Sequence, residues 1–211
     1  VNMPDSTDAY LDKIKALQDV GGGFRWYPQF PVSPYLTREV SFLLTRLHML
    51  TKGKPGEQVN TKAVHYLLEQ RIDSAYFSSS DLRTLYVALW SDVRLSKEEQ
   101  KKVDYLLKLA KKVEPDEMGY EGQALLALVW NKDGEQRKAK RFVEAFKKYL
   151  VTSPDRGSYI EFPKGSFVSI DRKLHIHVQM MEALGKVMPE ETKLLSGMRR
   201  YLLQQKRTQE W

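Results

Sequence analysis

The alternation between two kinds of helical segment constrains this chain more than any other feature. LRTLYVALW (82–90) and GQALLALVW (122–130) are apolar nearly all round, whereas EEQKKVDYLLKLAKK (98–112) and EQRKAKRFVEAFKKYL (135–150) are apolar on one side only. A helix that is apolar all round has to be buried on most of its surface, and a one-sided helix can cover it. The pattern therefore predicts an inner and an outer layer of helices.

Start signals and apolar spacing predict nine helices in all. The first spans about residues 7–18 and the second about 34–51. Asn60 is expected to cap the third helix and Ser80 to open the fourth. Ser96 and Glu99 have the spacing of a capping box for the fifth helix. The later helices are expected to begin near Glu117, at Asp133 or Gly134, at Asp171, and with Pro189 in the first turn.

The period changes at one place only. SYIEF (158–162) and SFVSI (166–170) are rich in β-branched and aromatic residues, and Pro163-Lys164-Gly165 separates them. This pattern predicts one short β-hairpin near 158–170. The helical hairpins repeat weakly at roughly 40 to 50 residues, which is typical of repeat architectures. We therefore expect an all-α fold, a partial α/α toroid of inner and outer helix hairpins, with that one β-hairpin.

The segment GGGFRWYPQFPVSPY (21–35) places five aromatic rings and three prolines in a stretch that cannot be a regular helix or strand. In a toroid, a loop of this kind lies near one mouth of the central funnel, where its rings either hold a ligand or fill the space. Aromatic side chains beside apolar helices bury large areas. We expect Trp26 and its neighbours to be buried plugs, so that Trp26→Ala would cost about 3 to 5 kcal/mol.

Composition excludes several classes of site. The 211 residues include no cysteine, which rules out disulfides, thiolate zinc sites and a cysteine nucleophile. The sequence lacks a run of about 18 apolar residues that would span a membrane. The net charge of +7 comes largely from basic pairs on helices with acids nearby. Such pairs are typical of solvated helix faces, and we expect no nucleic-acid partner.

No constellation of residues predicts catalysis. Five acids are candidates for a glycosidase pair near a funnel mouth, but several stand at helix starts, where an acid interacts favourably with free N–H groups. These acids are Asp73, Asp81, Glu117, Glu121 and Glu161. His175 and His177 are two apart, so in a helix they point to different sides and cannot easily share a metal. We expect no catalytic, cofactor-binding or metal-binding residue.

Two segments resemble one family. GGGFRWYPQFPVSPYLTREVSFLLTRL resembles the GGFxWW…SpYlTayv segment in the helical, thioester-type domain of bacterial alpha-2-macroglobulins. HIHVQMMEALGKVMPEETKLLSGMRRYLLQQKRTQEW resembles the later part of that domain, where an inner helix ending in EAL or EAF precedes M…WLLxxKxTQxW. The residues at the family's positions are Gln204, Lys206, Thr208, Gln209 and Trp211.

The resemblance implies an α/α toroid and a noncatalytic domain of a protease trap. Residues 1–211 would then be one partial domain of a larger protein, without its first and last helices. Its partners would be proteases, reached through the full-length parent, and neighbouring domains. The parent would be periplasmic, or anchored by a segment outside this chain and facing the periplasm or cell surface.

The family's Cys-Gly-Glu-Gln thioester lies upstream of the matching segment. Lys54-Pro55-Gly56-Glu57-Gln58 imitates it, with proline in place of cysteine, and is interpreted as a turn between helices. The alternative function is an α/α-toroid enzyme or a carbohydrate-binding module that uses the aromatic funnel, with Trp26, Tyr27 and Tyr120 as the rings that would contact sugar.

Overall fold

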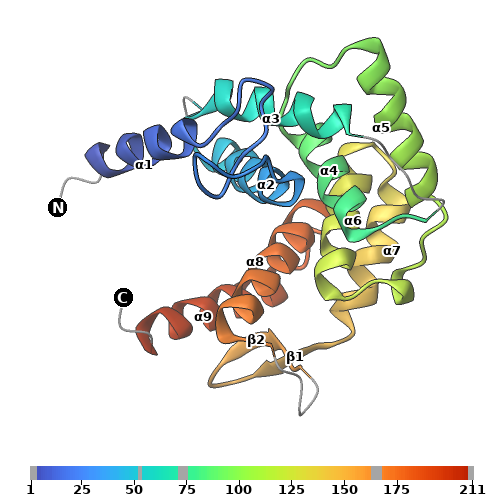
Figure 1. Cartoon of the computed structure of the whole chain (residues 1–211). Helices are drawn as coiled ribbons and strands as arrows, with labels where there is room; N and C mark the ends of the chain where they lie inside the picture. Colours follow the sequence, from blue (N-terminus) through green and yellow to red (C-terminus); the bar gives the residue numbers. More distant parts are fainter. Residues whose placement is uncertain (1–3, 52–53, 71–75, 163–167, 209–211) are drawn as a thin grey trace. The chain divides into compact units, whose positions relative to one another are not determined.

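The chain folds mainly into helices (Figure 1). This computed structural model describes residues 4–51, 54–70, 76–162 and 168–208. Within these ranges it has nine α-helices, a short 3-10 turn and one two-stranded antiparallel sheet, which confirms the expected all-α class with a short hairpin. The chain divides into two compact units, residues 1–112 and 113–211, called here the N-terminal and C-terminal units. The expected single domain over 1–211 stays a prediction.

The N-terminal unit consists of five helices. They are α1 (Pro4–Ala16), α2 (Pro34–Leu50), α3 (Glu57–Glu69), α4 (Ser79–Trp90) and α5 (Lys97–Ala110). Helix α2 packs against α3 and α4, and α4 packs against α5. The apolar face of α1 lies on a cluster that joins this helix to α2 and α3 through Phe24, Leu44 and Val59. Each of the two most apolar helices, α2 and α4, is therefore covered by the helix that follows it.

The C-terminal unit has the same pairing of helices. Its elements are η1 (Pro115–Glu117), α6 (Tyr120–Lys132), α7 (Gln136–Lys147), β1 (Leu150–Ser153), β2 (Gly157–Ile160), α8 (Ile170–Val187) and α9 (Thr192–Thr208). Every residue of α6 from 123 to 130 is buried, whereas α7 buries only one face. Helix α6 packs against α7 and α8, and α8 against α9. The predicted contrast between all-round and one-sided helices is confirmed for α6 and α7.

Some helices start where capping residues in the sequence predicted, and others do not. The capping box at Ser96 is confirmed, because its hydroxyl accepts the Glu99 N–H (3.2 Å) and the Glu99 carboxylate accepts the Ser96 N–H (2.7 Å). The cap assigned to Asn60 was wrong, since α3 starts after Gly56. Asn60 is instead buried within α3 and donates to Thr45 on α2 (3.0 Å). A polar residue that joins two helices was mistaken for a helix start.

Other starts lie one to three residues away from those expected, and Pro189 precedes α9 and does not stand in its first turn. Ser78, not Ser80, caps α4, and its hydroxyl accepts the Asp81 N–H. Ser169, not Asp171, caps α8. In both cases another serine or acid close by offered a competing signal.

The β-hairpin lies earlier in the chain than expected. Strand β2 coincides with the start of SYIEF, but its partner is β1, in the register Leu150↔Ile160 to Ser153↔Gly157. The predicted pairing of 158–162 with 166–170 is therefore wrong, although residues 163–167 lie outside the described ranges. Ile170 is the first residue of α8. The turn signal that was missed precedes Gly157, whose φ of +86° favours glycine.

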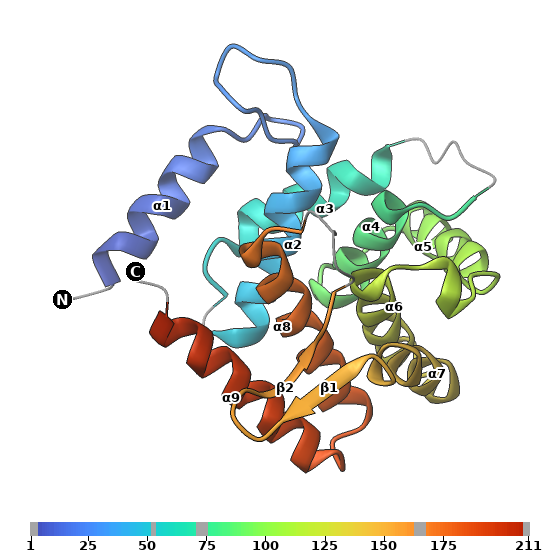
Figure 2. The same ribbon diagram turned by 90° about the horizontal axis from the view of Figure 1, so that it is seen from below.

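The hairpin lies directly against α9 (Figure 2). Two glycines permit this approach: a Cβ on Gly157 would come within 2.3 Å of the Gly197 carbonyl oxygen, and one on Gly197 within 2.2 Å of Ser158 Oγ. Arg200 donates to the Pro154 carbonyl (3.2 Å), so α9 also holds the turn of the hairpin. Among the described helices, each is too short or too polar to cross a membrane.

Candidate functional site

The aromatic loop, residues 24–33, has its two ends fastened together. The Ser33 N–H donates to the Phe24 carbonyl (2.8 Å), and the Phe24 N–H donates to the Thr37 hydroxyl (2.8 Å). That hydroxyl in turn donates to the Ser33 carbonyl (2.8 Å). Thr37 is fully buried in the first turns of α2. These three bonds, called here the Thr37 clasp, fix where the chain leaves the core and where it returns.

The glycines before the loop allow the backbone to approach its neighbours closely. A Cβ on Gly22, whose φ is +94°, would lie 2.2 Å from the Lys62 carbonyl oxygen. A Cβ on Gly23 would lie 2.3 Å from a methyl carbon of Val32. Contacts below 3.0 Å require a neighbouring atom to shift, a backbone carbonyl at Gly22 and side chains at Gly23. The glycines therefore serve tight packing of the loop base against α3 and against the loop's own return.

An ion pair braces the outer side of the loop base. The Asp19 carboxylate accepts the Gly21 N–H (3.0 Å) and pairs with the Arg25 guanidinium. Arg25 also donates to the Pro28 carbonyl (3.3 Å). The pKa of Asp19 lies below its usual value, chiefly because of the Gly21 N–H and with a further contribution from Arg25. Backbone and side-chain contacts together brace the base of the loop.

The rings of the loop divide between core and solvent, which overturns the expectation that they plug the core. Phe24 is 1% exposed and packs in the cluster under α1. Three other rings of the loop face solvent, Trp26 (53% exposed), Tyr27 (58%) and Phe30 (46%), as does Tyr35 (60%) in the first turn of α2. Tyr27 and Phe30 meet edge to face with centroids 5.1 Å apart. We call these four rings the aromatic surface. The Thr37 clasp lets one ring enter the core and turns the others outward.

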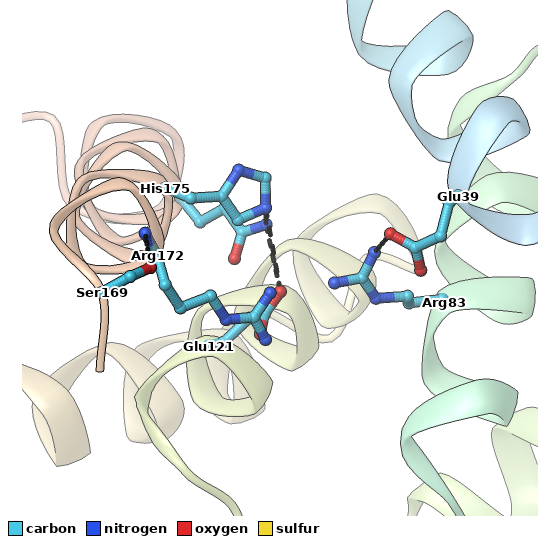
Figure 3. Close-up of polar contacts among 7 residues, drawn as sticks. Glu39, Arg83, Glu121, Ser169, Arg172 and His175 are labelled. Carbon is cyan, nitrogen blue, oxygen red and sulfur yellow. Dashed lines mark hydrogen bonds and ion pairs between the residues drawn. The ribbon is translucent and has the colours of Figure 1, made fainter. Parts of the chain in front are cut away.

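A second group of polar side chains lies in the C-terminal unit, where the start of α6 meets the start of α8 (Figure 3). Glu121 is only 15% exposed at its side chain and pairs with the Arg172 guanidinium. The amide of Gln179 donates to His175 Nε2 (2.8 Å) and approaches Glu121 at 3.5 Å. We call this group the Glu121 cluster. It joins the first turns of two helices, where a carboxylate also interacts favourably with the helix dipole.

His175 lies between two polar neighbours, Gln179 and Glu121. Gln179 Nε2 lies 2.8 Å from His175 Nε2, within hydrogen-bond distance. Glu121 Oε1 lies 3.9 Å from the same nitrogen, which makes an ion pair when His175 is protonated. The Arg172 guanidinium also pairs with Glu121. The hydroxyl of Ser169 accepts the Arg172 N–H as a helix cap, so the cluster presents a structural contact between two helices.

His175 and His177 face different neighbours, as the helical spacing predicted. His177 Nε2 donates to the Met198 carbonyl of α9 (3.1 Å), and its ring lies 4.9 Å from that of Tyr201. Burial lowers the pKa of His177, consistent with a neutral ring. No group of three or more His, Asp or Glu in the described part of the chain is placed to hold a metal.

The remaining candidates are held at helix starts or lie at the surface. Asp81 accepts the Ser78 N–H (2.8 Å), and Glu117 accepts the Glu114 N–H (2.6 Å). Both acids therefore cap the start of a helical segment, which was the alternative to a catalytic role. Glu161 is exposed, and Asp73 lies outside the described residues. Gln58 lies in the first turn of α3 after a turn at Pro55 and Gly56, which confirms the interpretation of that segment as a connection between helices.

Tyr120 was the third ring expected to contact sugar under the alternative function. Its ring packs against those of Tyr149 (5.4 Å) and Phe162 (5.8 Å) within the C-terminal unit. A separate ion pair, Arg83 with Glu39 at 2.6 Å, joins α4 to α2 in the N-terminal unit (Figure 3). The absence of catalytic, cofactor and metal residues remains a prediction.

Comparison with known proteins finds no matching family model and no matching curated protein.

The division of the aromatic rings predicts unequal effects on stability. Phe24→Ala should lower the free energy of unfolding by about 3 to 5 kcal/mol, because it removes a buried ring. Trp26→Ala should lower it by less than about 1 kcal/mol, as is usual for exposed positions. Urea unfolding of the two variants and the parent chain measures both. A loss from Trp26→Ala as large as that from Phe24→Ala would contradict the exposed placement.

The ion pair at the loop base predicts that the stability of the loop depends on pH. Since the pKa of Asp19 is lower in the folded chain than in the unfolded one, its contribution to stability is present in full above the unfolded pKa of about 4 and is lost as the pH falls through the folded value. The amide protection factors of residues 21–27, corrected for the intrinsic pH dependence of exchange, should therefore fall in that range. Asp19→Asn should remove the titration, and an unchanged profile in that variant would show that another group is responsible.

Proposed function

We propose that this chain is a noncatalytic domain of a bacterial alpha-2-macroglobulin-like protease trap, an endopeptidase inhibitor. The observation that carries the proposal is the aromatic surface, which stands outside a loop held by the Thr37 clasp and by the Asp19–Arg25 pair. Rigid exposed rings offer a large contact area at little cost in conformational entropy. The same loop carries the first of the two segments that resemble the family.

The arrangement of helices is consistent with the proposed toroid. Within each unit the apolar helices pack on one another, α2 on α4 and α6 on α8, and each is followed by the helix that covers it. We propose that these hairpins form the inner and outer layers of an incomplete α/α toroid. The domain would act as a rigid body whose docking to neighbouring domains changes when a protease cuts a bait region elsewhere in the parent. Such a parent would work in the periplasm or at the cell surface.

A second function is favoured by the same exposed rings. Trp26, Tyr27 and Tyr35 are each more than half exposed, and exposed aromatic rings also suit binding of carbohydrate. Under this alternative the loop would be the binding face of a carbohydrate-binding module or an α/α-toroid enzyme. Saturable binding of an oligosaccharide that Trp26→Ala abolishes would favour this alternative over docking to a protein domain.

The chain alone should inhibit no protease and take up no methylamine. A thioester requires a thiol, and the sequence has no cysteine; trapping also requires a bait and an enclosing shell. Incubation with radioactive methylamine, and a protease assay on a large protein substrate, measure the two activities. Labelling at Gln58, or stoichiometric inhibition by the chain, would contradict the interpretation of residues 54–58 as a connection between helices.

The full-length polypeptide that carries this sequence provides the positive test. After exposure to a protease it should protect a large protein substrate while the same protease still cleaves a small peptide substrate. A protease left equally active on both substrates would exclude a trap. Substituting Trp26 and Tyr27 together by alanine should weaken the trap without altering the helical content of the isolated chain.

A further inference from the structure

The hairpin and α9 line an open groove of about 550 Å³ in the C-terminal unit. One wall is formed by the hairpin, with the hydroxyls of Thr152 and Ser153. The other is a stripe of α9 that includes Thr192, Lys193, Ser196 and Arg200. Ser196 and Arg200 follow Thr192 at intervals of four residues, and Lys193 lies three residues before Ser196, so these side chains line neighbouring strips of the helix. The groove is thus a concave surface with several hydrogen-bond donors.

The charge of this groove is positive and not neutralised. No carboxylate is among the described residues that line it. Lys193 is exposed and has no ion-pair partner within the described part of the chain. Arg200 donates one N–H to the Pro154 carbonyl, which orients the guanidinium and leaves its other donors for a ligand. Unpaired cations in a concave surface attract anions more strongly than isolated surface cations do.

The backbone around the groove also favours an anion. Gly197 has no side chain, so the hairpin can lie close to the helix at the floor of the groove. The groove also reaches the first turn of α9, which begins at Thr192. The N–H groups and the dipole at a helix start interact favourably with negative charge. The Thr192 and Ser196 hydroxyls can donate to an oxygen beside them.

We propose that this groove binds a tetrahedral oxyanion, the phosphate or sulfate group of a small polar molecule. Lys193 and Arg200 contact the anion, the hydroxyls of α9 and the hairpin contact the polar body of the ligand, and the volume fits a small-molecule site. The site is independent of the aromatic surface and of the proposed role in a protease trap, because it lies in the other unit and uses none of the same residues.

Inorganic phosphate, glucose 6-phosphate and glucose are suitable probes, at constant ionic strength in chloride buffer. Titration calorimetry measures affinity, and the backbone amide signals of Gly157 and Gly197 report whether binding occurs in the groove. Lys193→Gln should weaken phosphate binding about tenfold, because it removes a charge-assisted hydrogen bond. Lys206→Gln changes the same charge on the exposed end of α9, away from the lining, and should weaken it less than about twofold.

The three probes separate the source of the oxyanion. Tighter binding of glucose 6-phosphate than of phosphate identifies an ester of a polyol as the ligand class, and equal binding identifies the free anion; both support the site. Absence of any signal at Gly157 and Gly197, or equal losses in the Lys193 and Lys206 variants, would overturn it. Binding of glucose as strong as that of its phosphate would also overturn it, because the charge would then be irrelevant.

Discussion

The Thr37 clasp is the interaction on which the account of this chain depends. One hydroxyl on α2 accepts from Phe24 and donates to Ser33 (2.8 Å each), and it is fully buried. Removing this hydroxyl would leave the buried Phe24 N–H without its partner, although the Ser33 carbonyl would still accept the Thr37 N–H (2.9 Å). The clasp sets Phe24 into the core and leaves the following rings outside. The proposed docking function rests on that division.

Polar contacts and glycines play a matching part in the C-terminal unit. Arg172 and Glu121 join the starts of α8 and α6, while Gly157 and Gly197 allow the hairpin to lie on α9. In both units, therefore, buried apolar helices provide the core, and a few polar or glycine contacts decide where the loops lie. The two surfaces of functional interest, the aromatic surface and the groove beside α9, are both consequences of such contacts and not of the helix pattern.

The helices were predictable because their signals are local. Ser96 and Glu99 are three residues apart and form the capping box that their spacing predicted. Asn60 was misinterpreted because its role depends on Ser41 and Thr45, which the local sequence does not identify as partners.

The hairpin was misplaced because SYIEF can pair with a strand on either side, and the sharp turn before Gly157 decides the choice. The aromatic content of residues 24–35 predicted large apolar area but could not reveal its direction, which depends on Thr37 and on the contact of Gly23 with Val32. The groove had no sequence signal, because its donors come from two segments that only the fold brings together.

Tryptophan fluorescence tests the central claim most directly, because Trp26 belongs to the aromatic surface and Trp26→Phe leaves every other tryptophan unchanged. The signal lost in this variant, obtained as the difference between the two spectra of the folded chain, belongs to Trp26. The account predicts that this component resembles tryptophan in water and is readily quenched by acrylamide. A component at short wavelength that acrylamide hardly quenches would place Trp26 in the core, and would contradict a docking surface built on the Thr37 clasp.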